Sequence, residues 1–144
     1  MTGRYKITTL EKGKVVSETD WIDNLIMAGV SNGTGLIARA LIADGTYPPA
    51  ITSASIGTSS TAPAITDTAL VAPVLSGIIV RTKSATATLV SLSFFITDAE
   101  LTNGTYREFG LFCGAQLFAR SLISPVYTKS TGQDAIITYQ ITIT

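Results

Sequence analysis

The sequence contains no histidine, one cysteine and few charged side chains. Only 14% of its 144 residues are Asp, Glu, Lys or Arg, whereas soluble domains average about a quarter. The absence of His excludes Ser-His-Asp triads, Cys–His pairs and imidazole metal sites. Cys113 alone can form neither an internal disulfide bond nor a thiolate metal cage. We therefore expect no catalytic residue, no metal and no cofactor.

Net charge and long apolar runs are also missing. Ten Lys and Arg residues balance ten Asp and Glu residues, and the absence of a basic run argues against nucleic-acid binding. No stretch of about 18 apolar residues predicts a transmembrane helix. The first residues lack the apolar core of a signal peptide, and a lone Cys fits a reducing cytoplasm. We expect neither a nucleic acid nor a membrane as partner.

Small hydroxyl side chains are abundant instead. The chain has 22 Thr and 13 Ser residues, roughly a quarter of the total. Thr is β-branched and suits a pleated, half-exposed surface. Such a neutral surface is either simply solvated or built to pack against other chains, because desolvating charges at an interface is costly. The composition favours self-association or assembly into a larger particle.

The chain is short enough for one domain, and its pattern changes near residue 50. We predict an N-terminal arm or hairpin over residues 1–18, removable without loss of the fold, and a single domain over residues 19–144. Thr19 or Asp20 resembles a helix N-cap and is followed by apolar residues at helical spacing. This pattern predicts a short helical segment over about residues 20–44.

The remainder of the sequence alternates with a period of two residues. It predicts strands near residues 51–56, 74–83, 86–97, 106–113, 116–123 and 135–144, with a long loop over residues 57–67. Asn103-Gly104 is a tight-turn signal, and Pro125 should interrupt strand pairing. Several strands at this spacing predict an antiparallel β-sandwich.

One acidic side chain stands among apolar neighbours. Glu108 shares a strand face with Tyr106 and Phe112, so it needs a partner if it is buried. We predict an ion pair with Arg120 in the adjoining strand, with Arg81 as another possible partner. The alternative is an exposed Glu on an edge strand.

Three patterns that suggest chemistry have simpler structural interpretations. The segment from Asp98 to Gly104 carries several oxygen donors but lacks calcium-loop spacing, so turn formation explains it better. Asp98 and Glu100 could serve a glycan hydrolase as a carboxylate pair, although the same turn accounts for them. The glycine-rich segment 29–35 lacks the lysine of a phosphate loop and is interpreted as a helix-to-helix turn.

Two further segments carry a resemblance when they are taken together. The first is GTSSTAPAITDTAL at residues 57–70, and the second combines EFGLF at 108–112 with LFAR at 117–120 and Lys129. With WIDNLI at 21–26, they resemble a group of bacteriophage virion proteins found as tail-fibre or tail-associated modules. Ser59 replaces the group's second glycine, and Val71 stands near the position where the group often has an acidic residue.

The resemblance implies a non-enzymatic structural protein that is assembled in the host bacterial cytoplasm and incorporated into the virion tail as a fibre, baseplate or tail-tip component. Its expected partners are copies of itself, with a trimer favoured, and other virion proteins. The residues it marks as structural or interface candidates are Trp21, Asn24, Gly57, Thr58, Thr61, Pro63, Asp67, Glu108, Gly110, Phe112, Arg120 and Lys129.

Two alternatives remain open. A lone domain of this size with a free arm would also suit a capsid decoration protein that stabilises the phage head. A carbohydrate-binding module that recognises a host-surface glycan would need exposed aromatic side chains. The candidates for that role are scattered along the sequence: Trp21, Tyr47, Tyr106 and Tyr127.

Overall fold

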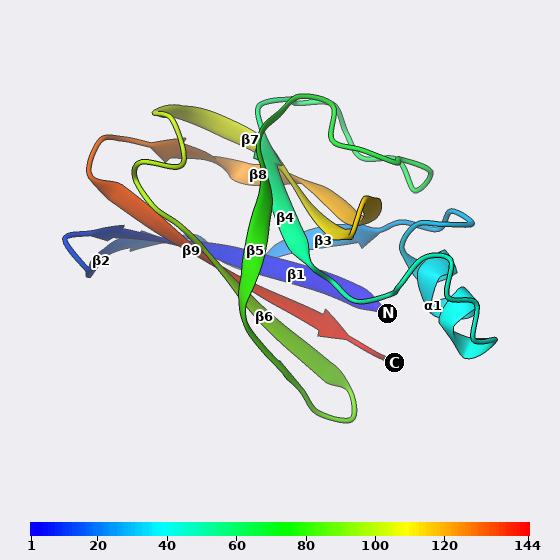
Figure 1. Ribbon diagram of the computed structural model, residues 1–144. Coiled ribbons are helices and arrows are strands. Elements are labelled where there is room, and N and C mark those ends of the chain that lie inside the picture. The colour runs from blue at the N-terminus through cyan, green and yellow to red at the C-terminus, as the bar shows by residue number, and fades with distance from the viewer.

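A computed structural model describes all residues from 1 to 144 and consists of nine strands and one short helix (Figure 1). The strands are β1 (Thr2–Glu11), β2 (Lys14–Glu18), β3 (Ile22–Ile26), β4 (Ser53–Gly57), β5 (Pro73–Ala85), β6 (Leu89–Ile96), β7 (Gly104–Cys113), β8 (Gln116–Lys129) and β9 (Gln133–Thr142). The helix α1 spans Thr34–Leu41 and lies outside the strands, at the end where both chain termini emerge.

Eight of the strands form a closed antiparallel barrel. Their order is β1-β3-β8-β7-β4-β5-β6-β9, and β9 pairs again with β1. That closing pair is long, running from Thr2 opposite Thr142 to Glu11 opposite Gln133. β2 pairs only with β1 and lies outside the ring. The predicted β-sandwich is therefore wrong: a sandwich has free sheet edges, whereas β1 joins the two ends of this sheet.

The interior of the barrel is filled by side chains that alternate along each strand. On β9, Ala135, Ile137, Tyr139 and Ile141 are buried, which matches the predicted period of two. Aromatic rings meet at the centre, where the Tyr5 ring lies 4.6 Å from that of Phe109. The core is thus a packed barrel interior, built in part from the first strand of the chain.

The N-terminal residues form the hairpin that was one of two predicted alternatives. β1 and β2 pair around Lys12 and Gly13, both of which have positive φ. β1 is also a member of the barrel, and its Tyr5 and Ile7 are almost completely buried. Residues 1–18 are therefore no removable arm, because losing them would open the barrel and expose its core.

The helical prediction for residues 20–44 is wrong over its first half. Residues 22–26 form β3, in which Ile22, Asn24 and Ile26 are buried while Asp23 and Leu25 point outward. The Thr19 hydroxyl accepts a hydrogen bond from the Ile7 backbone N–H at 3.0 Å and caps no helix. Over these few residues the apolar spacing fits both the helical period of 3.6 and the strand period of two. The segment forms a strand because it pairs with β1 and β8.

The hairpins in the second half of the chain agree more closely with the predictions. β7 and β8 turn at Gly114 as predicted, and β7 begins at Gly104. Pro125 interrupts the ladder: Tyr106 opposes Tyr127 while Glu108 opposes Leu122, so β8 bulges between these pairs. Residues 29–35 follow β3 and run into the first two residues of α1, so they form a strand-to-helix turn where a helix-to-helix turn was predicted.

Candidate functional site

The long loop between β4 and β5 covers the outer wall of the barrel at β7 and β8. Glu108 on β7 and Arg120 on β8 point outward beneath this loop, and both side chains are fully buried. The Arg120 guanidinium donates to Glu108 Oε2 from Nη2 at 3.0 Å and from Nε at 3.2 Å. The predicted ion pair is confirmed. Arg81, the other predicted partner, lies over the Phe95 ring instead.

The same two side chains bind the loop itself. Arg120 Nη1 donates to Asp67 Oδ2 at 2.8 Å, and its Nη2 donates to the carbonyl of Thr61 at 2.8 Å. Glu108 accepts the backbone N–H groups of Val71 at 3.1 Å and Ala72 at 2.6 Å. We call Asp67, Glu108 and Arg120 the loop clamp. It satisfies the buried charges with partners from both ends of the loop, as a buried ion pair requires.

Two glycines allow the loop to approach this closely. A Cβ added at Gly110 would lie 2.4 Å from Leu70 Cδ1, so only glycine leaves room for the Leu70 side chain on the barrel wall. A Cβ at Gly57 would lie 2.3 Å from the carbonyl oxygen of Ala72 and 2.7 Å from Glu108 Oε1. Both residues therefore serve the packing of the loop.

A second cluster lies at the turn before β7, around the buried side chain of Lys129. Its ammonium donates to the Asp98 carboxylate, to the Asp98 carbonyl at 3.0 Å and to Asn103 Oδ1 at 3.1 Å. The hydrogen bond from Lys129 holds the pKa of Asp98 below its usual value. Glu100 accepts the Thr97 backbone N–H at 2.8 Å. The oxygen donors of this segment thus bind an ammonium group of the chain itself, and the turn interpretation explains them.

The remaining predicted residues are dispersed. Trp21 precedes β3, and the Arg4 guanidinium lies 4.4 Å from its ring centroid. Thr58 is exposed and donates its backbone N–H to Ala72, and Pro63 is half-buried in the loop. Phe112 packs against a small cluster of Met27, Leu70 and Leu117 beneath the loop.

Asn24 belongs to the barrel interior. It is buried, and its side-chain amide faces the buried hydroxyl of Tyr139. Nearby, the Ser121 hydroxyl donates to Tyr5 Oη at 3.0 Å. Burial raises the pKa values of Tyr5 and Tyr139 well above that of a free tyrosine. Asn24 therefore has a place in the fold and none on a surface that a partner could reach.

The aromatic side chains proposed for glycan binding do not lie together. Tyr106 and Tyr127 are buried, with ring centroids 6.3 Å apart. Tyr47 packs against the core beside the Arg39 guanidinium, 5.5 Å from its ring. Trp21 is the most exposed of the four, at 37%. These positions form no shared aromatic platform.

The structure contains an apolar cavity of about 490 Å³ that no sequence pattern predicts. Because Met1, Ile37 and Ile143 line it, it lies at the barrel end that carries α1 and both termini. Ten of its thirteen lining residues are hydrophobic, and the full set is Met1, Ile37, Pro49, Ala50, Ile51, Lys83, Ser84, Ala85, Val90, Leu92, Phe118, Ile141 and Ile143. This volume lies within the range of small-molecule sites, roughly 300–1,000 Å³.

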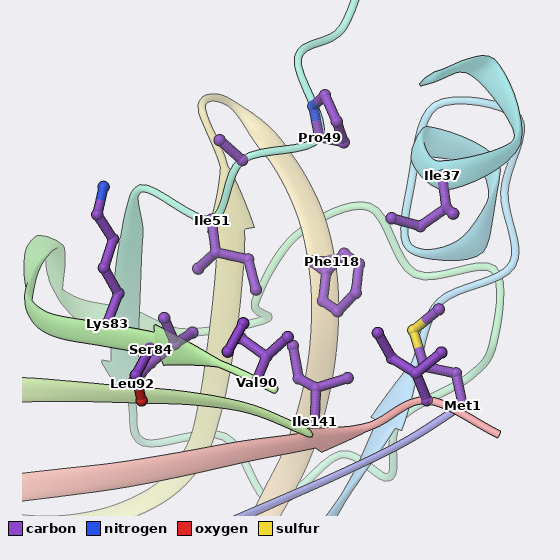
Figure 2. Close-up of a pocket in the computed structure, with 13 residues that line it drawn as sticks. Met1, Ile37, Pro49, Ile51, Lys83, Ser84, Val90, Leu92, Phe118 and Ile141 are labelled. Carbon is purple, nitrogen blue, oxygen red and sulfur yellow. The ribbon is translucent and has the colours of Figure 1, made fainter. Parts of the chain in front are cut away.

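The cavity is assembled from distant parts of the chain. Figure 2 shows Phe118 in the middle of the group, with Val90 and Ile141 below it and Ile37 reaching in from α1. Lys83 stands at one edge, beyond Ser84, and is the only lining residue with a charged side chain. An alternating strand pattern marks Val90 and Ile141 as buried but does not show that a space remains between them.

No group of three or more His, Cys, Asp and Glu side chains is placed to hold a metal ion. The structure has no helix with the length and apolar character needed to cross a membrane. Comparisons of the chain with protein-family models, with curated proteins and with solved structures found no match. The function must therefore be argued from the residues and their geometry.

Proposed function

We propose that this chain is a non-enzymatic structural protein of a bacteriophage virion, located on the tail, that acts by self-association and by packing against other virion proteins. The proposal rests on the resemblance of its motifs to tail-fibre and tail-associated modules. It treats the loop clamp and the Lys129 cluster as structural devices and assigns them no chemistry.

The observation that carries this proposal is the contact between the two segments that bear the resemblance. Residues 57–70 and the EFGLF and LFAR segments are far apart in sequence. Arg120 and Glu108 of the second set bind each other, and Arg120 also binds Asp67 and the carbonyl of Thr61 in the first. Motif residues that meet in one buried cluster form a single structural unit, which supports treating the resemblance as one pattern.

Exposed apolar side chains support the proposed mode of action. Val30, Leu41 and Ile42, which flank or end α1, are exposed by 75%, 83% and 78%. We call these three residues the helix-end surface. Burial of exposed apolar side chains favours association between proteins. Packing between copies would bury the helix-end surface.

The test of self-association is the mass of the purified protein by light scattering and native mass spectrometry. We expect a closed oligomer, with a trimer favoured, that Leu41→Glu dissociates because it places a charge in the contact. Ile79→Glu is the matched control, since Ile79 is 73% exposed but lies on β5 and outside the helix-end surface. A monomeric wild-type protein that also fails to assemble on virions would contradict the proposal.

The position in the particle needs a separate experiment. Antibodies against the chain, applied to purified virions and viewed by electron microscopy, should label the tail. Labelling of the head would replace the tail assignment with that of a capsid decoration protein. Absence of the chain from purified virions by mass spectrometry would contradict both.

A further inference from the structure

The apolar cavity at the barrel end has no part in the proposed assembly. It is also separate from the loop clamp, because Asp67, Glu108 and Arg120 do not line it. Its walls come from β5, β6, β8, β9, α1 and the segment before β4, so that it is enclosed on several sides (Figure 2). A concave apolar space of this size suits a small-molecule ligand with apolar surface.

We propose that this cavity binds a single-chain anionic amphiphile, that is, an alkyl chain with one carboxylate. The lining defines the two halves of such a ligand. Leu92, Phe118 and Ile141 offer hydrocarbon surface and are themselves almost fully buried, so they form a fixed floor for an alkyl chain. Burial of each additional methylene group should tighten binding about fourfold until the cavity is full.

Charge complementarity specifies the head group. No carboxylate lines the cavity, and the one charged side chain is the Lys83 ammonium at its edge. Lys83 is exposed and makes no ion pair within the chain. A ligand whose alkyl chain lies on the floor can therefore place its carboxylate beside Lys83 while the carboxylate stays hydrated. A cationic head group at the same place would be repelled by the Lys83 ammonium.

The direct test is isothermal titration calorimetry of the full chain with sodium alkanoates of six to twelve carbons, below their micelle concentrations. We expect affinity to rise about fourfold per methylene and then level off. Decanoate should bind more tightly than decanol, and decanol more tightly than decyltrimethylammonium. Equal or tighter binding of the cationic amphiphile, or no binding of any alkanoate, would overturn the proposal.

Two variants locate the ligand. Lys83→Gln should reduce decanoate affinity about threefold, to the level of decanol, because an exposed charge pair contributes little. Lys14→Gln, in β2 and outside the cavity, is its control. Ala85→Trp should abolish binding of all alkanoates by filling the cavity from its exposed rim, and Thr82→Trp on the same strand should not. Unchanged binding in Ala85→Trp would overturn the assignment of the site.

The oligomeric mass of each sample distinguishes this proposal from the proposed assembly. We expect Ala85→Trp to lose decanoate binding while its mass and melting temperature stay those of the wild type. If Ala85→Trp changes the oligomeric mass and the wild type binds no alkanoate, the cavity receives a side chain of another copy and the amphiphile proposal fails. If Leu41→Glu leaves decanoate binding intact but the wild type is monomeric, only the assembly proposal fails.

Discussion

Replacing Arg120 by Met should destabilise the chain more than any comparable change at an exposed ion pair. The substitution keeps the length of the apolar stem but removes the guanidinium that contacts Glu108, Asp67 and the Thr61 carbonyl. Glu108 would remain fully buried, with two backbone N–H groups as its only partners. A buried charge left without its counter-ion is unfavourable because nothing replaces its lost hydration.

The expected loss is about 3–5 kcal/mol in the free energy of unfolding. For a chain near 150 residues this corresponds to a decrease in melting temperature of roughly 6–20 °C. It is a large share of a total stability that is typically about 5–15 kcal/mol. Urea unfolding followed by circular dichroism measures the loss through the shift of the midpoint.

The double variant with Glu108→Gln makes the reasoning testable even if Arg120→Met folds poorly. The glutamine side chain keeps a carbonyl acceptor for one of the two loop amides and carries no charge. Because a buried charge without a counter-ion costs more than one lost hydrogen bond, the double variant should be more stable than Arg120→Met alone. Lys6→Met, which breaks an exposed pair with Glu18, is the control and should change stability little. Equal effects of Arg120→Met and Lys6→Met would refute the account of the loop clamp.

Three other expectations follow from the same structure. Gly57→Ala should destabilise the chain by about 1–3 kcal/mol in urea unfolding, because its Cβ would collide with the Ala72 carbonyl, whereas Gly45→Ala, in open space, should not. Cys113 should resist Ellman's reagent at pH 8 and react in denaturant, because burial raises the pKa of its thiol to about 12; rapid reaction of the native protein would contradict this. Hydrogen bonds lower the pKa values of three carboxyl groups that are exposed or partly exposed. They therefore stabilise the fold above about pH 4, and this contribution is lost as the pH falls through the lowered values. Acid titration of the melting temperature should show that decline, and stability that rises below about pH 4 would contradict it. These groups are Glu18, Asp44 and Asp98.

The ion pair of the candidate site could be predicted because it depends on one hairpin. Glu108 and Arg120 lie on strands joined by a short turn, so their proximity follows from strand alternation and the Gly114 turn. A carboxylate among apolar residues then requires a cation. The contacts with Asp67 and Thr61 could not be derived this way. They depend on a long loop returning to the barrel wall, and no local period describes its path.

The apolar cavity could not be predicted for a related reason. Its lining residues lie on separate elements, and each is an ordinary apolar side chain in its own segment. Whether these apolar side chains fill the space between them depends on how α1 and the segment before β4 lie relative to the barrel. Ile37, Ile51 and Phe118 enclose a space only because those segments lie beside the end of the barrel (Figure 2).

Closure of the barrel is the step that separates the structure from the predicted sandwich. Both folds use antiparallel strands with the same alternation, so strand patterns alone cannot distinguish them. The distinguishing contact joins Thr2 to Thr142 and continues for the whole length of β1. On the other side of β1, β3 reaches β8 through only Leu25 and Ile26, opposite Arg120 and Ala119. Arg120 therefore occupies the narrowest junction of the ring as well as the loop clamp, so one residue links the closure of the barrel to the motif loop on its outer wall.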